Sequence, residues 1–164
     1  MYSLSMHDCI EAAKAELLRA KDRIARNLET TPDDKINWSP SPTARTAVQQ
    51  VAHAAISVPG LQGWLSGDPF PFKDVAEMDS WSRNEEKKYT NRADVLALLD
   101  KNVSAYNVWL DGLTEEQLNG TVSMGPQSFP MTSAITFAAD HTRAHASQID
   151  YMQTIYGDLD WHMG

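Results

Sequence analysis

The amino-acid sequence predicts an all-α fold, a four-helix bundle with a long crossover between its second and third helices. Four segments have apolar residues at the spacing that places them on one face of a helix, and few segments alternate as strands do. Roughly two dozen residues (68–92) separate the second and third segments, which is long for a connection in a compact domain. Helices of this number and length are typical of a bundle.

The first predicted helix covers residues 6–28. Ser5 and Asp8 resemble a capping pair at its start, and Pro32 disfavours helical geometry just after its end. Its apolar stripe consists of Met6, Cys9, Ile10, Ala13, Leu17, Ala20, Ile24 and Leu28. The stripe indicates that this helix buries one face in the core.

A stiff connector with two prolines, in which we expect Trp38 to fill the core, leads to the second helix. We expect that helix to begin between residues 43 and 46 and to continue to residue 67. Pro59 lies inside it, and we predict a kink there and not a break.

The crossover, residues 68–92, should contain a short helical turn or contribute to a site. The third helix is predicted for residues 93–113, followed by a loop with a short extended piece, and the fourth for residues 132–156. A twenty-residue helix is only ~30 Å long. The crossover can therefore span the bundle, so that the second and third helices run parallel.

Composition limits the class of function. The chain has 164 residues and is expected to form one domain, residues 1–164. Its formal charge is −8, from 22 acidic and 14 basic side chains, which argues against nucleic acid as a partner. No apolar run is long enough for a membrane span, and no signal peptide is recognisable. With one cysteine no intrachain disulfide can form, and we expect a cytoplasmic protein.

Two histidines four residues apart mark the last helix. A core seam with alternating spacings of four and three runs through Ala134, Ala138, His141, His145, Gln148, Met152 and Ile155. Imidazoles four apart are stacked neighbours on a helix and can bind one metal ion together. Such a pair can equally be hydrogen-bonded packing residues, so its spacing leaves both interpretations open.

A third histidine, His53, lies in the middle of the second helix among small and apolar residues. If it faces inward at the height of His141 and His145, the three rings form a three-nitrogen site with open coordination positions, as a reactive metal centre requires. His7 and His162 lie near the termini, and we expect both to be exposed.

Two stretches resemble the DinB-like superfamily, also called DinB/YfiT-like metalloenzymes. "LETTPDDKINWSPSPTARTAVQQVAHAA" is similar to that family's tryptophan–proline connector and histidine-bearing helix, and "DHTRAHASQIDYM" to its histidine-x-x-x-histidine, arginine, glycine, glutamine, isoleucine motif. Ala146 and Ser147 replace the arginine and glycine of that motif. The resemblance implies a divalent metal, usually zinc or nickel, held by His53, His141 and His145. It also implies the long crossover and a homodimer.

The resemblance further implies an enzyme that transfers a low-molecular-weight thiol to a small electrophile through a metal-bound thiolate, because a metal removes the proton of a bound thiol. A metal-dependent small-molecule hydrolase is the alternative. No inward carboxylate base is recognisable on the last helix, which favours the thiol chemistry. A non-enzymatic metal- or ligand-binding stress-response bundle, or a dimerising scaffold with a vestigial site, also stays open.

Roles for supporting residues follow from their positions. Gln148, one turn beyond His145, could orient a metal ligand or a bound water without touching the ion, or bond to a neighbouring helix. Asp140 and Arg143 are expected on the solvated face, and Cys9 in the core. Two tryptophans could line a mouth over the metal or belong to the core, namely Trp64 and Trp81.

Overall fold

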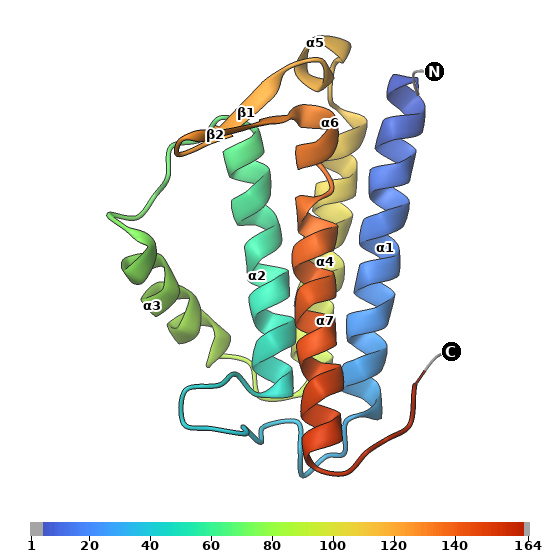
Figure 1. The fold of residues 1–164 in the computed structure, drawn as a ribbon, viewed down its shortest axis with the longest axis vertical. Helices are drawn as coiled ribbons and strands as arrows, with labels where there is room; N and C mark the ends of the chain where they lie inside the picture. The colour runs from blue at the N-terminus through green and yellow to red at the C-terminus, as the bar shows by residue number, and fades with distance from the viewer. Residues whose placement is uncertain (1–4, 163–164) are drawn as a thin grey trace.

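A computed structural model of the chain describes residues 5–162. Four long helices pack side by side along their lengths: α1 (Met6–Thr30), α2 (Ala47–Leu65), α4 (Arg92–Asp111) and α7 (Phe137–Ile155). Figure 1 shows that α1 and α7 run in one direction and that α2 and α4 run in the opposite one. The predicted four-helix bundle, with its second and third long helices parallel, is confirmed.

The crossover between α2 and α4 contains a further helix, α3 (Val75–Glu86), outside the four-helix core (Figure 1). Asp74 caps this helix, because its carboxylate accepts a hydrogen bond from the backbone N–H of Glu77 at 2.9 Å. The expected single turn is thus a helix of 12 residues.

Helix ends follow their capping residues. Ser5 and Asp8 form the predicted capping box at the start of α1. Thr46 and Gln49 form another at α2, which therefore starts at the late end of the predicted interval. Trp38 is half-buried and packs edge-on against Tyr156 at 5.8 Å.

Helix α2 continues through Pro59 without a break, as predicted. Proline has no N–H to donate to the carbonyl four residues earlier, which belongs to Ala55. That carbonyl accepts instead from Asn102 Nδ2 of α4 at 2.8 Å. The neighbouring helix therefore replaces the bond that the proline removes.

A small antiparallel hairpin covers one end of the bundle. It consists of β1 (Thr121–Met124) and β2 (Gln127–Pro130), between the short helices α5 (Glu115–Leu118) and α6 (Met131–Ala134). Gly125 begins its two-residue turn with a φ of 58°, a conformation that glycine adopts without strain. The hairpin corrects the predicted loop with one extended piece.

The last predicted helix, residues 132–156, is interrupted. The helical pattern stops after Ala134 and resumes at Phe137, so the segment forms α6 and α7. The carbonyl of Ile135 at this interruption accepts a hydrogen bond from the buried Tyr106 hydroxyl at 3.0 Å. The break is stable because this carbonyl has a partner from α4.

The core face of α7 is rotated from the predicted seam. Gln148 and Ile155 are exposed, whereas the buried residues are Ala138, Ala139, Thr142, His145, Ala146, Ile149, Met152 and Gln153. Thr142 can be buried because its hydroxyl donates to the Ala138 carbonyl at 2.8 Å. Small side chains on this face let α1 approach, and Asn27 Nδ2 bonds the Ala146 carbonyl at 2.9 Å. The histidines consequently lie at the edge of the core face, toward α2.

None of the helices in residues 5–162 is both long enough and apolar enough to cross a bilayer.

Candidate metal centre

Three histidines from two helices meet beside the core. His53 extends from α2, and His141 and His145 extend from successive turns of α7. One ring nitrogen of each lies within 4.8 Å of those of the other two. The His53 ring centre is 5.1 Å from that of His141 and 4.6 Å from that of His145. The structure therefore brings together the three predicted ligands.

Helix α3 fixes the orientation of His53. The Nδ1 atom of His53 lies 2.7 Å from Glu86 Oε1 and 3.0 Å from Ser82 Oγ. An ionised carboxylate only accepts hydrogen bonds, so Nδ1 has the proton and the lone pair is on Nε2. His53 thus offers Nε2 to the centre of the cluster.

His145 is held in the same tautomer from α2. Its Nδ1 donates to Gln50 Oε1 at 2.7 Å, which leaves the Nε2 lone pair free. His141 Nε2 is buried and has no hydrogen-bond partner in the described part of the chain. A buried nitrogen without a partner is costly unless a ligand satisfies it.

Burial keeps two of the rings neutral. It lowers the pKa of His141 to about 4, with a further contribution from the nearby His53 and Arg45 charges. Burial, with repulsion from His141 and His53, lowers the pKa of His145 to about 3. Both rings are therefore unprotonated at neutral pH, which is the form that binds a metal.

Glu86 is a buried charge with a full set of partners. Burial alone would raise its pKa, but hydrogen bonds from His53, Arg45 and Ser82 outweigh it and lower the pKa to about 2. Arg45 bonds both carboxylate oxygens, through Nε at 2.7 Å and Nη2 at 3.0 Å. The carboxylate is thus ionised and shared between a histidine and an arginine.

The donor set suits a divalent ion. Neutral imidazoles bind zinc and other late divalent metals, and three protein ligands leave a fourth position open. Within residues 5–162, the cluster that could hold an ion consists of these three side chains, and no carboxylate or thiol belongs to it. The unpartnered His141 Nε2 fits the same conclusion.

Comparison with known proteins places the fold. The family model of the DinB superfamily matches residues 16–149, most of the chain. The chain belongs to the DinB superfamily. The resemblance seen in the sequence is therefore confirmed, and no curated protein sequence is significantly similar to this one.

Solved structures share this DinB fold at low identity. YfiT from Bacillus subtilis, described as a probable metal-dependent hydrolase with an unusual four-helix bundle topology, is 17% identical with a TM-score of 0.71, over 96% of this chain and 92% of that one. A DinB-like protein (YjoA) from Bacillus subtilis is 16% identical, TM-score 0.61, over 91% and 94%. The mycothiol-dependent maleylpyruvate isomerase is 15% identical, TM-score 0.66, over 90% of this chain but only 63% of that one.

Of the two tryptophans, Trp64 lies far from the DinB histidines. Trp64 is eleven residues beyond His53 on α2, about 16 Å along the helix. It stacks on Phe137 at 6.1 Å and donates to the Ser123 carbonyl at 2.9 Å. Trp81 is exposed on α3. The Trp64 side chain therefore packs away from the histidines.

Other predicted residues lie as follows. Gln148 is exposed, at the rim of the site with its amide near His145. Arg143 pairs with Asp140 at 2.6 Å and also with Glu16, so both predicted surface residues face solvent. Cys9 is only half-buried, at the margin of the α1 stripe.

The two terminal histidines stay outside the cluster. His7 is exposed on the first turn of α1, as expected. His162 is half-buried and bonds Asp158 at 2.8 Å, so its predicted exposure is wrong. Neither ring contributes to the metal centre.

Sequence reasoning missed the residues that support the ligands, namely Gln50, Ser82, Glu86 and Arg45. Gln50 lies one turn before His53 and could have been found from that spacing. Ser82 and Glu86 are four residues apart in α3, but they belong to a charged segment that reads as a solvated surface. Their burial depends on where the crossover folds back.

A groove of about 280 Å³ opens next to the cluster, between the connector before α2 and the last turns of α7. Pro40, Ala44 and Met152 contribute apolar surface to it. Gln50 and Gln148, the two amides beside His145, also line it. The groove thus combines apolar walls with polar groups near the histidines.

Proposed function

We propose that this DinB-superfamily protein is a divalent-metal-dependent enzyme that transfers a low-molecular-weight thiol to a small electrophile. His53, His141 and His145 would hold the ion, zinc or nickel. The observation that supports this most directly is the convergence of three imidazoles, of which two, His53 and His145, have their outer nitrogens already anchored. A bound divalent ion with an open position supplies a Lewis acid that lowers the pKa of a thiol.

Residues of the chain orient the metal ligands and would bind the substrate. Glu86 and Gln50 hold two imidazoles in one tautomer and so keep their Nε2 lone pairs directed at one point. The groove beside Gln50 and Gln148 would bind the apolar part of the electrophile and exclude water from it. The substrate class that fits is a small molecule with an apolar portion.

Thiol transfer fits the site better than hydrolysis, because a hydrolase needs a free base near the reacting water. Glu86 is the carboxylate bonded to the cluster, and both its oxygens accept hydrogen bonds from other residues. With a pKa of about 2 it is a poor proton acceptor. Cys9 lies on α1 outside the cluster, so a nucleophile would have to come with the substrate.

The first experiment measures metal in protein purified without a chelator. Elemental analysis should find close to one equivalent of zinc or nickel in the wild type and a large loss in His141→Ala. Asp140→Asn, a change at an exposed neighbour in sequence, is the matched control and should retain the metal. Equal metal in wild type and His141→Ala would exclude the site.

The second experiment tests the reaction. The metal-loaded protein is mixed with a panel of low-molecular-weight thiols and monochlorobimane, and conjugation is followed by fluorescence. We expect at least one thiol to react faster with protein than without it. Conjugation no faster than the uncatalysed rate, together with hydrolysis of a simple ester, would favour a hydrolase; neither activity would leave a binding protein.

A further inference from the structure

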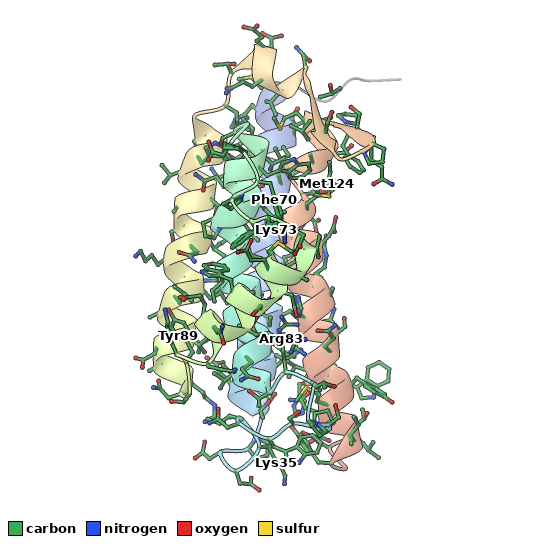
Figure 2. All side chains as sticks on the ribbon, turned by 90° about the vertical axis from the view of Figure 1, so that its left-hand side faces the viewer. Lys35, Phe70, Lys73, Arg83, Tyr89 and Met124 are labelled. Atoms are coloured by element: carbon green, nitrogen blue, oxygen red, sulfur yellow. The ribbon has the colours of Figure 1, made fainter. Side chains whose placement is uncertain are left out.

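Helix α3 is attached to the bundle mainly by polar contacts. Its buried side chains are those of Ser82 and Glu86, whereas Val75 and Trp81 are 68% and 44% exposed. Figure 2 views this face directly and shows α3 in front of α2. Lys73 marks the segment that precedes α3 in the sequence, and Arg83 lies near the C-terminal end of the helix. Little apolar surface is buried under α3, so few contacts other than these polar ones can hold it in place.

The strongest of these contacts end at the metal centre. Glu86 is 1% exposed, and its Oε1 atom accepts from His53 at 2.7 Å and from Ser82 at 2.9 Å. Its other oxygen accepts from Arg45 at 2.7 Å. At the rim, Arg45 Nη2 also lies 3.4 Å from the carboxylate of the half-exposed Asp79, a long and partly solvated contact that contributes little.

We infer that Glu86 is a positioning residue that couples metal binding at His53 to the docking of α3 on the bundle, an inference that rests on the proposed metal site. The Glu86 carboxylate fixes the tautomer and ring plane of His53, and so directs Nε2 to the other two histidines. A His53 ring that shares its Nε2 lone pair with a cation is in turn a stronger Nδ1–H donor to Glu86. Each event therefore favours the other.

The strength of the coupling between metal binding and α3 docking can be stated as a factor in affinity. Loss of such an outer partner typically lowers metal affinity about 10- to 100-fold. Linkage is reciprocal, so metal must stabilise the docked α3 by the same factor. A purely structural role for Glu86 predicts no such equality, since α3 would then dock equally well with and without metal.

The test combines zinc titration with hydrogen exchange measured by mass spectrometry on wild type, Glu86→Gln and Glu85→Gln. Glu85 is the adjacent position of α3, where it pairs with Lys88 near the surface, and it serves as the matched control. In wild type and Glu85→Gln, saturating zinc should slow exchange of the α3 amides about tenfold or more. In Glu86→Gln, zinc should bind about 10- to 100-fold more weakly and leave α3 exchange unchanged.

Two results would overturn the inference while leaving the proposed function intact. One is a wild type that binds zinc without any change in α3 exchange. The other is a Glu86→Gln variant whose α3 exchanges faster but whose zinc affinity equals that of wild type. A wild type that binds neither zinc nor nickel would overturn the proposed function and the inference together.

Glu86→Gln removes the main charge partner of the mostly buried Arg45 and could unfold the chain, so a milder variant accompanies it. Ser82→Ala removes the hydroxyl that bonds both Glu86 and His53 and keeps the charge pair. It should weaken zinc binding and reduce α3 protection in parallel, each about two- to tenfold. Unequal changes in the two quantities would contradict the coupling.

Discussion

Acidification should destabilise the metal-free protein well above the pH at which its carboxylates protonate. The cause is the pair of buried rings, His141 and His145, whose pKa values are about 4 and about 3 in the folded chain. In the unfolded chain both return to about 6.5. Below pH 6.5 the unfolded chain therefore binds more protons than the folded one, and the free energy of unfolding falls as the pH falls.

The size of this effect follows from the same values. Each unit of pH below 6.5 removes about 1.4 kcal/mol for each ring that stays neutral in the fold. Between pH 6.5 and 5 that amounts to about 2 kcal/mol for His141 and about the same for His145. Their sum, about 4 kcal/mol, is a large share of the stability of an ordinary domain. Glu86 has a pKa of about 2 in the folded chain, so its contribution to the free energy of unfolding is constant above pH 4.5 and is lost only below that pH.

The assay is urea unfolding followed by circular dichroism at pH 7, 6 and 5 in the presence of a chelator. Wild type should lose about 4 kcal/mol across this interval, and His141→Gln should lose about half as much, because one titrating ring is gone. The slope with pH is compared, and not the absolute stability, since the substitution also changes packing. A wild-type stability that is the same at pH 7 and pH 5, or an unchanged slope in the variant, would refute the reasoning.

Three further outcomes are expected. Tyr106→Phe should lower the free energy of unfolding by about 1–3 kcal/mol in chemical denaturation, because the buried Ile135 carbonyl loses its donor, while the exposed Tyr151→Phe should be neutral. Asn102→Ala should cost about 1–3 kcal/mol in wild type but clearly less in a Pro59→Ala background, where the helix itself can bond the orphaned carbonyl; equal costs in this double-mutant cycle would show that the two residues are not coupled. Zinc at a hundredfold excess over its dissociation constant should add about 2.7 kcal/mol to the unfolding free energy, and a melting temperature that does not depend on zinc would argue against a site in the folded state.

The bundle could be predicted because its information is local. The sequence alone shows the apolar period of each long helix, the capping box at Ser5 and the length of the crossover. That length also allows α2 and α4 to run parallel, as they do. The hairpin and the break before Phe137 could not be predicted from the local sequence. The break depends on a hydrogen bond to the Ile135 carbonyl from Tyr106, which is distant in sequence.

The candidate site could be predicted only in its innermost part. His141 and His145 can be recognised as candidate metal ligands from their spacing of four residues, and His53 from its position among small residues. The phase of α7 was predicted wrongly because Thr142 counts as polar in a pattern, although its hydroxyl is satisfied within its own helix. Glu86 was missed because a carboxylate in a charged segment resembles a surface residue until the folded chain brings Arg45 and His53 to it.

The pairing of α1 with α7 affects how the chain can fold during synthesis. These two helices share the most extensive contact in the bundle, and Asn27 bonds the carbonyl of a residue 119 positions later. At about 5–20 residues per second, α1 leaves the ribosome many seconds before its partner exists. During that time the apolar stripe of α1 stays exposed in the nascent chain, where chaperones or transient partners have access to it. The core can form only when α7 emerges.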